Sequence, residues 1–321
     1  MSSNALIKYR IQTWQVAVCV SIFVYLALGA ATHSVKLYHW FMLLAVPAAL
    51  LAAERGRRFF VDLAPLFAFW LIYDRLRLLQ PLLLDRVAVR LPYAMERWLF
   101  GWAAGGDVPA HAGRVWLAAQ AGTFYGAFIS WSLQLVYLSH LFALPLFMFW
   151  LWWQGYRDAR LRERFVRHIR AFTLLNFVGL AMYVLLPVAP PWWVTLNGIA
   201  QPTVDLVTQV NMSAAMEGSI VQALIRNAAQ WFAAVPSMHG AYPVLLALLA
   251  LKDRSRWIVA AFALYGAAMW TATVMLNQHY IIDLLAGAIL AVAAWLVAGS
   301  SINVSRELLE EPKANQAATG S

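Results

Sequence analysis

Apolar stretches of membrane-spanning length recur from one end of this 321-residue chain to the other. A helix needs about 20 consecutive apolar residues to cross the hydrocarbon core of a bilayer. The stretches that approach or reach this length are residues 14–31, 38–53, 60–74, 131–152, 170–187, 237–251, 257–275 and 281–298. We therefore predict an all-α, polytopic membrane helix bundle with about eight transmembrane helices.

The composition excludes a soluble globular protein. Apolar residues make up 62% of the chain and charged residues 12%, whereas soluble domains carry about 25% charge. The 16 Trp and 12 Tyr fit a membrane protein, because amphipathic rings collect at the two membrane–water interfaces. The single cysteine, Cys19, lies in the first apolar stretch, so a disulfide framework within the chain is impossible.

The first apolar stretch has an alternative interpretation. It follows Lys8 and Arg10 and ends in Gly29-Ala30-Ala31, which resembles a secretory signal peptide. The apolar run is longer than a usual signal core, which favours a retained membrane helix. The stretches at 38–53 and 237–251 are shorter than usual, so they must borrow flanking turns or cross where the bilayer is thin.

Four regions follow from the pattern. Residues 1–74 hold the N-terminal transmembrane helices. Residues 75–130 carry arginines scattered among apolar residues, which is typical of amphipathic helices that lie along the membrane interface. Residues 131–300 form the main transmembrane core. The polar tail at 301–321 loses apolar periodicity and is expected to be disordered.

The distribution of basic residues predicts the orientation. If the N-terminus is cytoplasmic, 16 of the 24 Lys and Arg residues fall in inner loops or the tail. The positive-inside rule favours this arrangement, with both termini cytoplasmic. Residues 75–130, 188–236 and 276–280 then share the outer face. The net charge of +9 thus reports topology, and we expect no nucleic-acid partner.

The strongest chemical motif opens the last apolar stretch. His279 and Asp283 are four residues apart, so on a helix they share one face, and Asp283 can accept a hydrogen bond from the imidazole. That bond would fix the tautomer and leave the other nitrogen as a nucleophile or base. Gly287, four residues after Asp283, lies on the same helix face and allows a neighbouring helix to approach closely. Alternatively, His279 snorkels at the interface with Asp283 as its partner.

A second motif starts the stretch at 237–251. Ser237 follows Pro236 and is a good N-cap, so a helix N-terminus with unpaired N–H groups should form there and attract phosphate. His239 would stand in its first turn. Pro243 should bend the helix, because it cannot donate a hydrogen bond to the carbonyl of His239. The alternative is a helix start that contains a histidine by chance.

Two further elements have open interpretations. Pro190-Pro191-Trp192-Trp193 follows the stretch at 170–187 and is either a substrate wall or an aromatic-belt anchor. Tyr137 and His140 lie within the stretch at 131–152. A histidine inside an apolar helix indicates either a polar cavity or a hydrogen bond between helices.

Together these motifs resemble the type 2 phosphatidic acid phosphatase superfamily, and within it the inositol phosphorylceramide synthase branch. The resemblance covers roughly residues 125–298. It rests on Pro236-Ser237-Met238-His239, the His279-Tyr280-Ile281-Ile282-Asp283 motif, Tyr137-Leu138-Ser139-His140 with Pro145, and Pro190-Pro191-Trp192. The first three stretches show only a weak similarity to this branch, around Tyr73-Asp74-Arg75-Leu76-Arg77.

The resemblance implies a six-helix phosphatase-like core with extra N-terminal helices and a role for each motif residue. His279 would attack phosphorus and become a phosphohistidine, Asp283 would orient it, and His239 would protonate the departing alcohol and then deprotonate the incoming hydroxyl. The site would face the outer or lumenal side. Ser237, His140 and Tyr137 would then bind substrate.

The chain also departs from the phosphatases of this superfamily. It has no Lys-x6-Arg-Pro motif, and Ala272 and Thr273 stand where those enzymes have Ser-Arg. Charge for the phosphate must come from elsewhere: the helix start at Ser237, and Arg75, Arg77 or Arg226. The departures favour transfer of a phosphorylated head group, such as phosphoinositol, because a phosphodiester donor carries less charge.

The expected partners are therefore a membrane phospholipid donor, a lipid or polyol acceptor, and the bilayer, with no cofactor or metal. Three alternatives stay open. The same residues could serve a phosphatidate or polyprenyl phosphate hydrolase. His239, His279 and Asp283 would also make a two-histidine, one-carboxylate metal set. A transporter or channel would explain the intramembrane polar residues without chemistry. The sequence leaves the oligomeric state open.

Overall fold

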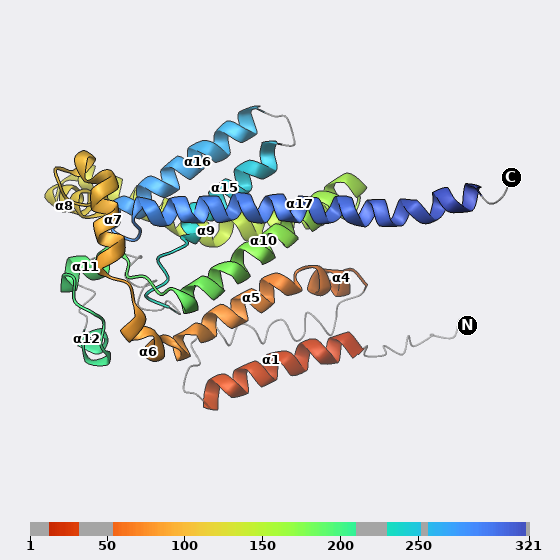
Figure 1. Ribbon diagram of the computed structural model, residues 1–321, viewed down its shortest axis with the longest axis horizontal. Coiled ribbons are helices and arrows are strands. Elements are labelled where there is room, and N and C mark those ends of the chain that lie inside the picture. Colours follow the sequence, from red (N-terminus) through yellow and green to blue (C-terminus); the bar gives the residue numbers. More distant parts are fainter. Residues whose placement is uncertain (1–12, 32–53, 210–229, 252–255, 319–321) are drawn as a thin grey trace, which may run out of the picture. The chain divides into compact units, whose positions relative to one another are not determined.

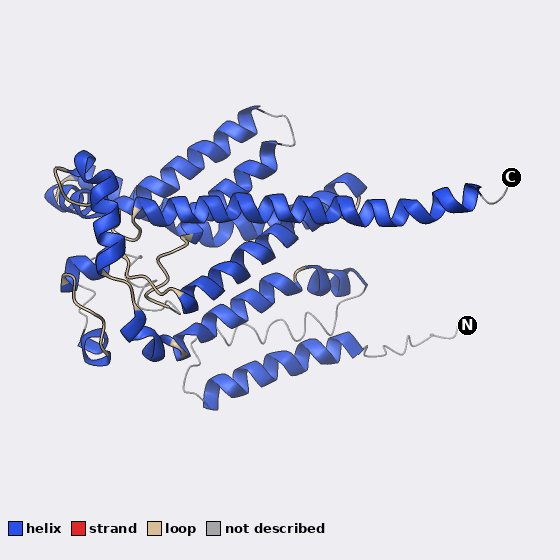
Figure 2. Ribbon diagram, viewed as in Figure 1, coloured by secondary structure: helices blue, strands red, loops and turns tan. Residues whose placement is uncertain are grey.

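The computed structural model describes residues 13–31, 54–209, 230–251 and 256–318, and these are mainly helical (Figure 2). Extended pairing in these ranges is limited to two isolated parallel bridges, Ala88 with Val188 and Val188 with Ala233. Five of the described helices are long and apolar enough to cross a membrane. The predicted all-α polytopic membrane fold is confirmed.

The chain divides into two units between Phe67 and Ala68. The first unit holds helix α1 (Thr13–Ala31), helix α4 (Glu54–Asp62) and the start of α5 (Ala64–Arg75). Helix α1 is a candidate membrane span, as predicted for 14–31. The predicted span at 38–53 lies outside the described residues.

The predicted span at 60–74 is not a single helix. Helix α4 ends at Asp62 and α5 begins at Ala64, with a turn at Leu63 between them. Pro65 explains the interruption, because it has no N–H to donate to the preceding turn.

The second unit is built around five helices, α9 (Phe124–Gly155), α10 (Ala159–Leu185), α15 (Met238–Leu251), α16 (Arg256–Met275) and α17 (Ile281–Ala318). Helix α15 packs against both α16 and α17, and α10 packs against both α9 and α17 (Figure 1). The spans predicted at 131–152, 257–275 and 281–298 lie within α9, α16 and α17. The one predicted at 237–251 starts one residue before α15, and the one predicted at 170–187 extends two residues past α10. Helix α17 runs into the tail at 301–321, whose disorder remains a prediction.

Short elements gather at one end of this bundle, where α15 and α17 begin and α10 and α16 end (Figure 1). They are η2 (Leu76–Leu78), α6 (Gln80–Leu83), η3 (Leu84–Arg86), α7 (Arg90–Phe100), η4 (Gly101–Ala104), α8 (Pro109–Ala119), α11 (Pro191–Asn197) and α12 (Val204–Gln209). Backbone hydrogen bonds join them: Ala88 N–H donates to Pro187 O over 2.8 Å, and Val188 N–H donates to Phe232 O over 2.8 Å. The described parts of 75–130, 188–236 and 276–280 thus meet at one end, as the topology predicts.

The two tryptophans of the Pro190-Pro191-Trp192-Trp193 run belong to the core at this end. Trp192 is 2% and Trp193 0% exposed, and the Trp193 ring lies 5.2 Å from the ring of Phe232. Trp193 also donates a hydrogen bond to Ala200 O over 3.0 Å. The aromatic-belt interpretation is therefore wrong for these two side chains, because a belt residue needs a ring at the membrane–water interface.

Helices α15 and α17 approach each other through two glycines. A Cβ on Gly240 would lie 2.7 Å from Leu284 Cα, and a Cβ on Gly287 would lie 3.0 Å from the Ser237 carbonyl carbon and closer still to its oxygen. In addition, Ser237 N–H donates to Asp283 O over 3.0 Å. The close approach predicted from Gly287 is confirmed, and it brings the start of α15 against the first turn of α17.

We predict that Gly287→Ala destabilises the protein by about 1–3 kcal/mol, because the new methyl group forces two backbones apart. Thermal unfolding in a fixed lipid or detergent environment measures the loss. Gly266→Ala is the matched control: its Cβ would meet only Pro243 Cβ, at 3.4 Å. That control should be neutral or gain up to about 1 kcal/mol from helix propensity. Equal effects of the two substitutions would contradict the close approach.

Candidate active site

A tight turn between α16 and α17 presents His279. Asn277 adopts a left-handed conformation with φ 60°, which asparagine tolerates better than most residues. Gln278 N–H donates to Thr273 O over 2.9 Å, and the Asn277 side chain donates to Thr195 Oγ1 of α11 over 2.8 Å. These two hydrogen bonds connect the turn to α16 and to α11, and they fix the position of His279.

His279 and Asp283 form the predicted pair. The His279 Nδ1 atom lies 3.4 Å from Asp283 Oδ2, and Asp283 is fully buried. The same carboxylate oxygen accepts the Tyr280 N–H over 2.9 Å. A proton on Nδ1 can donate to this carboxylate, which leaves Nε2 of His279 as the nitrogen with a free lone pair.

That second nitrogen meets the other histidine. His279 Nε2 lies 3.1 Å from His239 Nδ1, although the two residues are 40 positions apart in the sequence. His239 stands in the first turn of α15, so the predicted convergence of His239, His279 and Asp283 is confirmed. Within the described ranges, His239 Nε2 and Asp283 Oδ1 are buried without a hydrogen-bond partner. The arrangement places the two imidazole rings within hydrogen-bond distance of each other.

Two aromatic rings of α9 enclose His239. The Tyr137 ring stacks on it with centroids 4.5 Å apart and planes 19° apart, and the His140 ring lies 4.1 Å away. His140 Nδ1 lies 2.5 Å from the Tyr137 carbonyl oxygen, one turn earlier in the same helix. The structure therefore brings both residues to the site as ring contacts. Their role in binding substrate remains a prediction.

Ser237 caps α15 as predicted. Its Oγ accepts the Gly240 N–H over 3.3 Å, and α15 begins at the next residue, Met238. The preceding carbonyl, of Pro236, accepts a hydrogen bond from the Tyr183 hydroxyl over 2.9 Å. The helix start is thus held by α10, a contact that the sequence does not reveal.

The structure describes two of the three arginines that were predicted to bind phosphate, Arg75 and Arg77. Arg77 donates to the side chain of Asp74 and, over 2.8 Å, to its carbonyl oxygen, and Arg75 lies 3.9 Å from the same carboxylate. Leu76 between them packs with Tyr183 and Met238, beside the start of α15. Arg226 lies outside the described residues. Ala272 and Thr273 are fully buried, and the Thr273 hydroxyl donates to the carbonyl oxygens of Met269 and Trp270 in the same helix.

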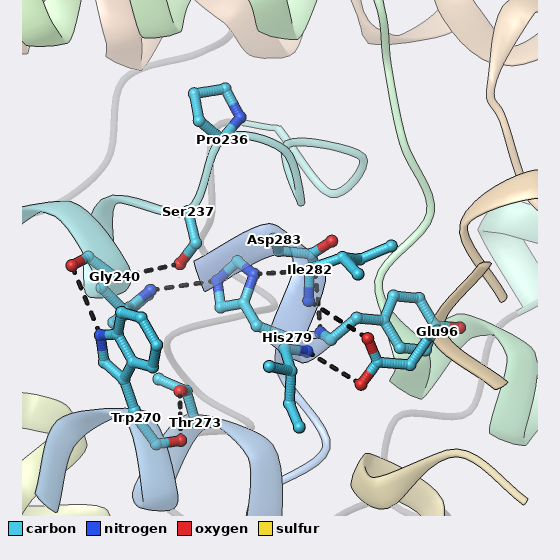
Figure 3. Close-up of polar contacts among 12 residues, drawn as sticks. Glu96, Pro236, Ser237, Gly240, Trp270, Thr273, His279, Ile282 and Asp283 are labelled. Carbon is cyan, nitrogen blue, oxygen red and sulfur yellow. Dashed lines mark hydrogen bonds and ion pairs between the residues drawn. The ribbon is translucent and has the colours of Figure 1, made fainter. Parts of the chain in front are cut away.

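One residue at the site was not predicted. Glu96 of α7 is fully buried and accepts the N–H of Ile281 over 2.9 Å and that of Ile282 over 3.1 Å (Figure 3). Burial raises the pKa of its carboxyl, and the two backbone donors partly offset that rise. The sequence shows only an acidic residue between Met95 and Arg97 in an amphipathic stretch, and it does not say which helix the carboxylate meets.

The metal alternative can be compared with this geometry. Asp283 and His239 approach opposite nitrogens of the His279 ring, so the donor atoms of the three side chains are not directed at one common ion position. Nowhere in the described ranges do three or more His, Cys, Asp or Glu side chains lie close enough together to hold a metal ion.

We predict that neutral His279 is the Nδ1–H tautomer and that Asp283→Asn lowers the fraction of this tautomer, because an amide holds the Nδ1 proton less strongly than a carboxylate does. Imidazole ¹⁵N NMR of histidine-labelled protein measures the tautomers. His140 is the internal control, since its Nδ1 faces a carbonyl of its own helix. A native His279 protonated at Nε2, or a tautomer unaffected by Asp283→Asn, would contradict the pairing.

Comparison with known proteins finds relatives over most of this chain and over parts of it. The chain is 28% identical to a phosphoinositol dihydroceramide synthase of Bacteroides thetaiotaomicron, over 89% of this chain and 90% of that protein. It is also 27% and 26% identical to inositol phosphorylceramide synthase catalytic subunits of Schizosaccharomyces pombe and Saccharomyces cerevisiae, over 40% and 36% of this chain and 31% and 30% of those proteins.

These relatives confirm the resemblance to the inositol phosphorylceramide synthase branch. No solved structure matches the chain. The family model described as the PAP2 superfamily matches residues 109–297, more than half of the chain and all of the motifs at the site. This chain therefore belongs to the PAP2 superfamily.

Proposed function

We propose that this integral membrane enzyme moves a phosphorylated head group from a phospholipid donor to a hydroxyl acceptor through a phosphohistidine at His279. One observation carries the proposal: His279 Nε2 lies 3.1 Å from His239 Nδ1 while Asp283 stands behind the opposite nitrogen. We assign His279 as the nucleophile, Asp283 as the carboxylate that orients it and His239 as the acid–base residue.

In the first half-reaction, the lone pair of His279 Nε2 attacks phosphorus, and the bond from phosphorus to the donor's lipid alcohol breaks. His239, as an imidazolium, gives a proton to the departing oxygen. The His279 ring becomes positive, and the Asp283 carboxylate stabilises it. The phosphoryl group must occupy the space between the two rings, so donor binding has to replace their direct hydrogen bond.

In the second half-reaction, neutral His239 takes the proton from the acceptor hydroxyl. The acceptor oxygen attacks phosphorus, the phosphorus–nitrogen bond breaks, and His279 returns to its starting form. The proton that the donor alcohol received is thereby replaced by the acceptor's proton, so the cycle balances. Water in place of the acceptor would make the enzyme a hydrolase.

The start of α15 supports a phosphate site beside these rings. Ser237 caps the helix, and a helix N-terminus favours negative charge. Arg75 and Arg77 flank Leu76, which packs beside this start, and they add positive charge. We place Tyr137 and His140 at the substrate and leave a contribution of Arg226 as part of the proposal.

The relatives support transfer over hydrolysis. The Bacteroides protein, which matches nearly the full length of this chain, is named as a synthase of phosphoinositol dihydroceramide. By analogy we propose phosphoinositol as the transferred group and a lipid hydroxyl as the acceptor. The buried, uncharged Ala272 and Thr273 fit a diester donor, which carries less charge than a monoester.

We further propose that the site faces the extracytoplasmic or lumenal side and that both termini are cytoplasmic. The positive-inside bias supports this orientation. The gathering of the site and the short helices at one end of the bundle is consistent with it.

The direct test is to trap the covalent intermediate. Native protein incubated with a phospholipid labelled in its phosphate should retain label in an acid-labile, base-stable bond, and His279→Ala should abolish it. His111→Ala is the control, since His111 on α8 is half-exposed and pairs with Asp107, which precedes that helix. Mass spectrometry of the lipid products should show a new phosphodiester.

Three results would contradict the proposal: no adduct on native protein, an adduct that persists in His279→Ala, or release of free phosphate or head group as the sole product. Loss of activity in EDTA with recovery on addition of a transition metal would favour the metal-dependent alternative.

The stacking on His239 gives a second prediction. Tyr137→Ala should lower kcat about tenfold or more, about 1.4 kcal/mol in barrier height, because His239 loses the ring that holds it. Tyr137→Phe keeps that ring and should stay within about twofold of native. Transfer assays at saturating donor separate the two outcomes. Equal losses in both variants would assign the effect to the hydroxyl instead.

A further inference from the structure

We propose that Glu96 is a positioning residue: its carboxylate caps helix α17 and thereby holds Asp283 at its working distance from His279. The inference rests on the proposed phosphohistidine chemistry and deepens it. Glu96 does not touch the reacting nitrogens. It acts through the backbone of the helix that carries Asp283.

The cap replaces one that the local sequence cannot provide. The first N–H groups of a helix have no partner within it and are usually satisfied by a Ser, Thr, Asp or Asn just before the helix. Tyr280 precedes α17 and has no side-chain acceptor that can fold back. Asp283 accepts the Tyr280 N–H, and Glu96 accepts those of Ile281 and Ile282, which lie 185 and 186 positions later in the sequence.

Both oxygens of the buried Glu96 carboxylate take part in this cap. Glu96 is 0% exposed, and each of its two oxygens accepts one of the two N–H groups. A buried carboxylate is costly unless hydrogen bonds and charge compensate it. Here the compensation comes from the two donors and from the positive end of the α17 dipole. The N-terminus of α17 is therefore occupied by the protein itself, which leaves the start of α15 for the phosphate.

Because the cap lies next to Asp283 in the helix, it can control the distance between Asp283 and His279. Asp283 directly follows Ile282, and its contact with His279 Nδ1 is already long, at 3.4 Å. Hydrogen bonds weaken steeply beyond this range, so a small shift of the first turn of α17 would break the contact. The same turn supplies the Asp283 carbonyl oxygen that accepts the Ser237 N–H, so the shift would also reach α15.

Glu96→Gln is the primary test. The amide keeps one acceptor oxygen but turns an N–H₂ donor toward the second backbone N–H, so it can satisfy only one of the two bonds. We expect kcat per folded protein to fall about 10–100-fold, while the donor KM stays within about twofold, because substrate contacts are unchanged. Hydrogen exchange at the amides of Ile281 and Ile282 should become faster.

Two further variants keep the test specific. Glu96→Asp retains both acceptors on a shorter side chain and should restore part of the lost kcat. Asp107→Asn is the matched control, because the Asp107 carboxylate also accepts a backbone N–H, that of Val108 over 2.7 Å, but just before α8 and not at α17. It should leave kcat and exchange at Ile281 and Ile282 unchanged.

A native kcat in folded Glu96→Gln protein would overturn the proposal, and so would a rise in KM alone. A loss of kcat matched by Asp107→Asn would do the same, since it would indicate a general effect of removing charge. If Glu96→Gln does not fold, Glu96→Asp decides: faster exchange at Ile281 and Ile282 with native kcat would overturn the proposal. Failure of the adduct experiment would overturn the proposed chemistry instead, while hydrogen exchange would still report the cap.

Discussion

The site depends on the close approach of α15 and α17, which is possible because neither Gly240 nor Gly287 carries a side chain at the crossing. Bulkier residues there would separate the two helix starts. With the backbones in contact, the Ser237 N–H reaches the Asp283 carbonyl oxygen, and the imidazoles of His239 and His279 come within hydrogen-bond distance. A membrane bundle gains little hydrophobic energy from helix pairing, so small residues and polar contacts of this kind are what define its interfaces.

The spacing of polar residues made the central site predictable. The four-residue interval between His279 and Asp283 is a local property of a helix, and so is the cap at Ser237. The meeting of His239 with His279 followed from topology, because alternate connections of a membrane bundle share one end. The helix break at Leu63 could also have been predicted, since Pro65 has no N–H to donate to the preceding turn.

Other features could not be predicted, because they depend on contacts between distant segments. Nothing in the pattern around Glu96 says that its carboxylate meets a helix 185 residues away. Trp192 and Trp193 are apolar and aromatic, so burial and an interfacial belt give the same sequence signature. Their burial follows from the backbone bonds that join the segments around Ala88, Val188 and Phe232. The short elements at the end of the bundle thus do more than cover it, because α7 holds the start of α17 through Glu96.

The most direct measurement of the central claim is a structure of the full-length protein with vanadate, which adopts the geometry of a phosphoryl group in transfer. Our account predicts vanadium bonded to Nε2 of His279, with the His239 ring across from it and Asp283 still on Nδ1. Vanadate bound elsewhere, or coordinated by His239 with His279 turned away, would contradict it.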